Sequence, residues 1–99
     1  MSTSAFTWLN KQGVRSNTGF DVQRIDRFTV LYAEEGKTVT VSVEPGLSAG
    51  RPVLCVSQDA FSKWDPPFGA LEISNDKQRQ LRENFVAAME FQGMGVSIE

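Results

Sequence analysis

The side chains that most often carry out catalysis are scarce in this sequence. Its 99 residues include no histidine and a single cysteine, Cys55. Without histidine there is no imidazole base near neutral pH, and no Ser–His or Cys–His pair that could activate a nucleophile. One cysteine can build neither a zinc site nor an intramolecular disulfide. No calcium-loop, phosphate-loop or dinucleotide motif occurs. We therefore predict a protein without enzyme activity, metal or cofactor.

Carboxylates remain as candidate functional groups. Glu34 and Glu35 are adjacent, but we expect them at the tip of a hairpin, where the cleft needed by a general acid–base pair is lacking. Cys55 lies in the most apolar short run of the chain, and we expect it to be a buried core residue with an unreactive thiol.

The most distinctive segment is Trp64-Asp65-Pro66-Pro67-Phe68. Two prolines remove backbone donors and fix φ, so the segment should be stiff. In one interpretation Trp64 and Phe68 clamp the loop onto the core, while Asp65 accepts backbone hydrogen bonds within the loop. In the other, a stiff aromatic and acidic loop forms a recognition edge that loses little entropy on binding. The two interpretations are compatible.

A β-hairpin over residues 27–44 is the clearest element. A two-residue turn at Glu35-Gly36 defines a register that collects large apolar residues on one side. The predicted pairs on that side are Tyr32–Val39, Val30–Val41 and Phe28–Val43, with Glu34–Lys37 next to the turn. The opposite-charge pair Arg27–Glu44 is predicted on the other side, at the far end of the hairpin. A shift of one residue would exchange the two sides, so the pattern specifies the register.

The rest of the chain supplies two further strands and one helix. A turn-rich link over 45–50 leads to a strand at 52–57, which has no polar alternation and should be covered on both faces. A single helical turn is expected over 59–64. The main helix spans about 75–92, with a cap at Ser74 or Asn75 and Gly93 as terminator. Alternation after Gly93 predicts a strand over 94–98.

Residues 1–19 allow two interpretations, between which the sequence does not decide. One is a short helix capped by Ser4 that ends at Gly13, and the other is an extended arm that packs Phe6 and Trp8 onto the sheet. The predicted fold is therefore a single α+β domain over 1–99. It consists of a small, mostly antiparallel sheet with one main helix on one face.

Charge and hydropathy limit the partners and the location. The net charge of −2 provides no basic field for nucleic acid or anionic lipid. The start of the chain lacks the basic and apolar regions of a secretory signal, and no apolar run reaches the length of a membrane helix. We expect a cytoplasmic protein with no membrane partner.

From Phe20 onward the chain resembles the small bacterial immunity proteins of contact-dependent growth inhibition and related polymorphic toxin systems. The matching features are the Val/Thr hairpin around Glu35-Gly36, the segment Trp64-Asp65-Pro66-Pro67, the helix start at Ile73-Ser74, and the helix end at Phe91-Gln92-Gly93 before Met94, Val96 and Ile98. The resemblance implies a cytosolic antidote that blocks the active site or substrate groove of a toxin's C-terminal domain, often a nuclease. It transfers no contact residue.

Two function hypotheses follow. In the first, an immunity protein binds a basic nuclease toxin through exposed acids, for which the candidates are Glu34, Glu35, Asp65 and Glu72. In the alternative, a single-stranded nucleic acid stacks on an aromatic sheet face. The residues of that face would be Phe28, Val30 and Tyr32, with Arg24 and Arg27 at the rim.

Overall fold

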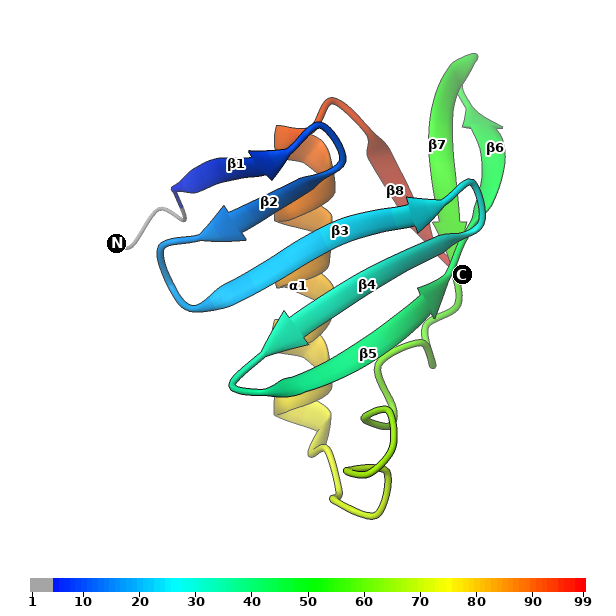
Figure 1. Cartoon of the computed structure of the whole chain (residues 1–99). Coiled ribbons are helices and arrows are strands. Elements are labelled where there is room, and N and C mark those ends of the chain that lie inside the picture. The colour runs from blue at the N-terminus through cyan, green and yellow to red at the C-terminus, as the bar shows by residue number, and fades with distance from the viewer. Residues whose placement is uncertain (1–4) are drawn as a thin grey trace.

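The computed structural model describes residues 5–99, which form eight strands and one helix (Figure 1). The strands are β1 (Phe6–Asn10), β2 (Gly13–Ser16), β3 (Phe20–Asp26), β4 (Thr29–Glu34), β5 (Lys37–Ser42), β6 (Glu44–Ser48), β7 (Arg51–Val56) and β8 (Gly95–Ile98). The helix is α1 (Asn75–Phe91). The prediction of one helix packed on a sheet is confirmed, but the described chain has two sheets and more strands than we predicted.

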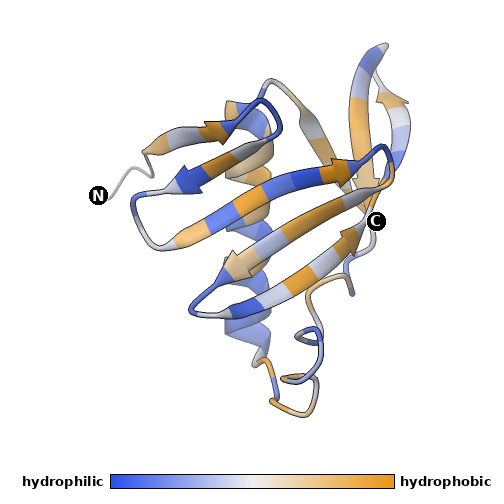
Figure 2. Ribbon diagram, viewed as in Figure 1, coloured by the Kyte–Doolittle hydropathy of each residue, from blue (hydrophilic) through white to orange (hydrophobic). Residues whose placement is uncertain are grey.

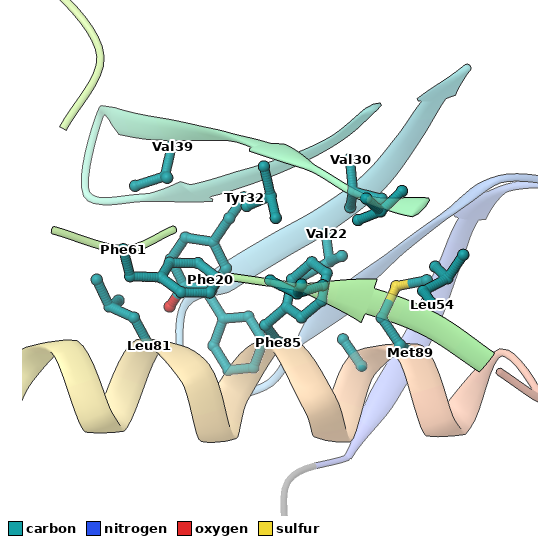
Figure 3. Packing of buried hydrophobic residues seen from close by; sticks show 14 of the residues in the cluster. Phe20, Val22, Val30, Tyr32, Val39, Leu54, Phe61, Leu81, Phe85 and Met89 are labelled. Carbon is teal, nitrogen blue, oxygen red and sulfur yellow. The ribbon is translucent and has the colours of Figure 1, made fainter. Parts of the chain in front are cut away.

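Strands β1 to β5 form an antiparallel sheet in sequence order, and α1 crosses one of its faces (Figure 1). Hydrophobic and hydrophilic residues alternate along β5 and the first part of β3, whereas β4 is hydrophobic over much of its length, as Figure 2 shows. The apolar set therefore points to the helix, and the polar set to the uncovered face. Figure 3 shows the resulting core, in which Phe20 and Tyr32 of the sheet and Phe61 of the connection between β7 and α1 meet Leu81 and Phe85 of α1.

The predicted register of the hairpin is confirmed. Val30 pairs with Val41 and Tyr32 with Val39, and all four side chains are buried. The hairpin is shorter than the predicted 27–44, because the paired strands end at Thr29 and Ser42. The Val43 amide still donates to the Phe28 carbonyl at 2.9 Å.

The side chain of Phe28 is nevertheless 55% exposed, so its predicted place in the core is wrong. Residues 27 and 28 form the β3–β4 turn. The predicted Arg27–Glu44 pair is also wrong, because Glu44 already belongs to β6, where it pairs with Cys55.

Helix α1 begins and ends as its capping residues require. The Ser74 hydroxyl accepts a hydrogen bond from the Lys77 amide at 3.2 Å, and Asp76 lies in the first turn, near the positive end of the helix dipole. At the other end Gly93 adopts a φ of 85°, which favours glycine. The stripe of Leu81, Phe85, Ala88 and Met89 is buried against the sheet. The predicted helix is confirmed to within one residue.

The strands predicted at 52–57 and 94–98 do not join the hairpin in a single sheet, because they belong to a second sheet with the order β6-β7-β8. Residues expected to be a turn-rich link form β6, which pairs antiparallel with β7, while β7 pairs in parallel with β8. Burial alternates along β7, since Leu54 and Val56 are buried but Cys55 is not. The expectations of a strand covered on both faces and of a core Cys55 are therefore wrong. Cys55 is half-buried, and this partial desolvation, together with the nearby carboxylates of Glu99 and Glu44, raises the pKa of its thiol.

The N-terminal segment is a β-hairpin and not a short helix. Strand β1 pairs antiparallel with β2, and Phe6 packs edge-on against Phe20 with ring centroids 5.8 Å apart. Trp8 remains 49% exposed and lies against Phe91 at the end of α1. The interpretation of an extended segment is therefore confirmed, with Phe6 packed onto the sheet and Trp8 about half exposed. The proposed cap Ser4 lies outside the described residues.

Candidate protein-binding surface

Three segments meet at the end of the molecule where α1 begins (Figure 1). They are the β4–β5 turn at Glu35-Gly36, the connection over 57–74, and the first turns of α1. We call this region the loop end. The connection contains turns and an isolated bridge between Lys63 and Glu72, but no helix, so the predicted helical turn over 59–64 is wrong.

Trp64 and Asp65 attach this connection to β5. The Trp64 side chain is only 6% exposed, which confirms that it is buried. The Asp65 amide donates to the Thr38 carbonyl at 2.8 Å. The Asp65 carboxylate accepts from the hydroxyls of Thr38 at 2.7 Å and Thr40 at 2.8 Å, and from the Thr40 amide at 3.2 Å. The predicted backbone donor is therefore present, but it belongs to β5 and not to the loop.

The bonds to β5 set the acidity of Asp65. Burial by itself would raise the pKa of this carboxyl, but the hydrogen bonds from Thr38 and Thr40 outweigh it and hold the pKa below its ordinary value. A carboxyl whose pKa is lower in the folded state stabilises the fold above its unfolded pKa of about 3.9. This stabilisation is lost as the pH falls through the lower, folded-state value.

We therefore expect Asp65→Asn to destabilise the protein most at neutral pH and progressively less below about pH 4. Urea unfolding at several pH values between about 7 and 2 measures the difference from the unmodified chain. Asp59→Asn, at an exposed position in the same connection, is the matched control. A difference for Asp65→Asn that is the same at every pH would contradict the assignment.

Beyond this anchor the chain presents apolar side chains to solvent. The Phe68 amide donates to the Asp65 carbonyl and the Leu71 amide to the Phe68 carbonyl, both at 3.0 Å, so successive turns fix the loop. Leu71 is 51% exposed and Phe68 is also exposed, next to the exposed prolines 66 and 67. A stiff, anchored loop that exposes apolar surface is typical of a protein-recognition site.

Lys37 joins the β4–β5 turn to the loop. Its Nζ lies 4.0 Å from a carboxylate oxygen of Glu35, 5.4 Å from the centroid of the Trp64 ring and 6.0 Å from that of Phe68. A lysine at these distances is attracted by the faces of both rings. The turn and the loop therefore form one continuous surface.

Glu34 is part of an internal hydrogen-bond network. It accepts from the Tyr32 hydroxyl at 2.7 Å and from Lys77 of α1, and its side chain is only 11% exposed. Asn84 of α1 donates to the same Tyr32 hydroxyl at 3.0 Å. Burial raises the pKa of Tyr32, and the charge of Glu34 adds to this effect, so the phenol stays neutral. The network fixes the position of the helix on the sheet.

The four predicted contact carboxylates thus fall into two pairs. Glu34 and Asp65 hold elements of the fold together, and neither presents a free carboxylate to a partner. Glu35 and Glu72 are exposed at the loop end, and Glu72 is in no ion pair within residues 5–99. The predicted pairing of Glu34 with Lys37 in the hairpin is confirmed, but the prediction missed the ion pair of Glu34 with Lys77, which forms only after α1 packs on the sheet.

The aromatic face of the nucleic-acid hypothesis is not available in this structure. Val30 and Tyr32 are fully buried beneath α1, so neither can stack on a base. Phe28 is exposed but stands alone in the β3–β4 turn. The uncovered face of the sheet instead presents Thr38, Thr40 and Ser42 and their neighbours on the other strands. Stacking platforms require adjacent exposed rings, which that face lacks in the described strands.

Two further observations concern the described residues 5–99. No three acidic or cysteine side chains gather there closely enough to hold a metal ion. Helix α1 does not have the length and apolar character that a membrane-crossing helix requires. In comparisons with known proteins, no family model, no curated protein and no solved structure matched the chain.

Proposed function

We propose that this protein works by binding another protein through the loop end, and that the partner is a toxin domain which it neutralises. The observation that supports a protein partner is the exposed pair Phe68 and Leu71 on a loop fixed by Trp64 and Asp65. Exposed apolar residues of this kind, surrounded by polar ones, are characteristic of interface centres.

The anchored loop favours affinity because little is left to order on binding. The loop is bonded to β5 through Asp65 and closed by its own turns, so association costs less conformational entropy than it would for a mobile segment. Leu71 and Phe68 would supply the desolvated centre of the contact. Glu35 and Glu72 would lie at its rim, where charges act mainly on the association rate.

The proposal of a toxin rests on the resemblance to immunity proteins from Phe20 onward. That resemblance implies a cytoplasmic antidote to a delivered C-terminal domain, and we propose a basic nuclease as its class. A nuclease must be positive where it holds phosphate, so acids at the rim would guide the antidote to that groove. A sequence without histidine supports a blocking role more than a catalytic one.

The test is co-expression with the C-terminal toxin domain encoded beside this gene. We expect the unmodified chain to protect cells and to form a one-to-one complex. Leu71→Arg should weaken binding about thirtyfold, which corresponds to about 2 kcal/mol at a central contact, because a charge replaces a desolvated apolar side chain.

Leu47→Arg is the matched control, because Leu47 is exposed on β6, away from the loop end. It should protect as well as the unmodified chain. If Leu47→Arg abolishes protection and Leu71→Arg does not, the surface is misassigned. If the unmodified chain gives neither protection nor a complex at micromolar concentration, the toxin proposal is wrong.

A further inference from the structure

The two edges of the five-stranded sheet differ in how they are protected. At β5, Asp65 occupies the edge, since its amide binds the Thr38 carbonyl and its carboxylate binds the Thr40 amide. At β1, no strand of the described chain pairs with the outer edge. Proteins normally protect such edges with charges, prolines or a covering segment, because an open edge pairs with other strands.

The register identifies the free backbone groups of β1. The Asn17 amide donates to the Ala5 carbonyl, so this pair is hydrogen-bonded. Hydrogen-bonded and non-hydrogen-bonded pairs alternate along an antiparallel ladder. Phe6–Ser16 and Trp8–Val14 are therefore non-hydrogen-bonded pairs, while Thr7–Arg15 is hydrogen-bonded. It follows that Phe6 and Trp8 point their N–H and C=O groups to the open edge.

The side chains of β1 offer no protection either. Residues 5–10 carry no charge and no proline. Trp8 is about half exposed, and Leu9 and Phe91 are exposed beside it. The Phe91 ring lies 5.3 Å from that of Phe6 and 5.7 Å from that of Trp8, so the edge continues into an aromatic cluster at the end of α1.

We propose that β1 pairs antiparallel with β1 of a second copy of this chain, about a two-fold axis at Thr7. The outward backbone groups lie symmetrically on either side of Thr7, at Phe6 and Trp8. In this register Phe6 of each copy faces Trp8 of the other, and both pairs are of the hydrogen-bonded type. The two sheets then form one continuous sheet.

A second copy fits this edge for reasons of symmetry and charge. A two-fold contact brings the same patch together from both sides, so the patch must be complementary to itself. Here each outward donor meets an acceptor, and aromatic side chains pair across the strands on the helix side. Because residues 5–10 are uncharged, no like charges meet at the axis. The irregularity between Trp8 and Asn10 disfavours a register centred further along β1.

This contact is independent of the proposed toxin binding. Phe91 ends α1, whereas the loop end contains the residues that begin it. The 17-residue helix separates the two surfaces by about 25 Å. Loss of one interaction should therefore leave the other intact, and the two proposals can fail separately.

The proposal can be tested by placing charged residues at Thr7, where the two-fold axis brings the two copies together. Sedimentation equilibrium from about 1 to about 100 micromolar should show a reversible dimer of the unmodified chain. Thr7→Lys and Thr7→Glu should each raise the dimer dissociation constant at least about tenfold, since like charges would lie directly opposite. An equimolar mixture of the two variants should recover the dimer, because unlike charges then meet at the axis.

Ser42→Lys is the matched control, because it places the same charge on the uncovered face at the other edge of the sheet. It should dimerise like the unmodified chain, and circular dichroism should show all four proteins folded. A chain that stays monomeric at the highest concentration overturns the proposal. So does a mixture of Thr7→Lys and Thr7→Glu that remains monomeric, because association would then not occur through paired β1 strands.

Discussion

Replacing Val41 with aspartate is expected to unfold the protein. The Val41 side chain is fully buried in the hydrophobic core, and its cross-strand neighbour is Val30. A carboxylate there would have no cation to pair with among these apolar neighbours. Burial of an unpaired charge costs several kcal/mol, a large part of the roughly 5–15 kcal/mol that stabilises a domain of this size. Loss of the cooperative urea transition, followed by circular dichroism, measures the effect.

Ser42→Asp is the control for this substitution. Ser42 is the next residue along β5, and its exposed side chain points to the opposite face of the sheet. The same carboxylate placed there should change stability by less than about 1 kcal/mol. A Val41→Asp protein that melts cooperatively near the temperature of the unmodified chain would show that the assigned register or the buried face is wrong.

Truncation of Trp64 to alanine should lower the free energy of unfolding by about 3–5 kcal/mol. The indole is almost fully buried, and the Lys37 Nζ lies 5.4 Å from the centroid of its ring. Its removal leaves a cavity in the core and loosens the connection that Asp65 holds against β5. Urea unfolding gives the change in stability, and limited proteolysis should show faster cleavage within 66–72.

Phe28→Ala is the matched aromatic truncation, because the Phe28 ring is more than half exposed in the β3–β4 turn. It should cost less than about 1 kcal/mol. If Trp64→Ala were equally mild, the indole would not be part of the core. Trp64 would then belong to the recognition surface and not to its support.

The elements that the sequence predicts well are those whose signal is local. The hairpin of β4 and β5 follows from alternation over about a dozen residues around Glu35-Gly36. Helix α1 follows from its stripe, its Ser74 cap and Gly93. The error at Phe28 also has a simple cause. The alternating pattern extends back beyond Thr29, the first residue of β4, into the β3–β4 turn, where Phe28 is exposed.

The second sheet was missed because its signals depend on distant residues. Pro45 and Gly46 indicate a turn, but β6 is an edge strand, where proline is tolerated. The strands also approach closely at Gly46, since a Cβ there would lie 2.9 Å from the Cys55 sulfur and the sulfur would have to shift. Parallel pairing of β7 with β8 joins segments about 40 residues apart in the sequence, and no local pattern predicts this pairing.

Dependence on residues distant in the sequence also explains why the roles of Asp65 and Glu34 at the candidate site were not predicted. The sequence around Asp65 predicts an exposed acid in a loop. Its hydrogen-bond partners Thr38 and Thr40 lie more than 20 residues earlier in the chain, so local sequence does not reveal them. The sequence around Glu34 predicts a residue next to a turn, but its hydrogen-bond donor Lys77 lies 43 residues later in the chain. The stiffness of the Trp64–Phe68 segment was predictable from its prolines. Which of its side chains would remain in solvent was set by the packing of β5 and α1.

The placement of the two tryptophans makes the protein its own optical probe. Trp8 lies exposed at the β1 edge and Trp64 lies buried beneath the loop end, and the chain has no third indole. A collisional quencher such as acrylamide reaches Trp8 far more readily than Trp64. Fluorescence from Trp8 therefore reports on occupancy of the edge, while fluorescence from Trp64 reports on the integrity of the loop anchor. Each surface can be followed without a label.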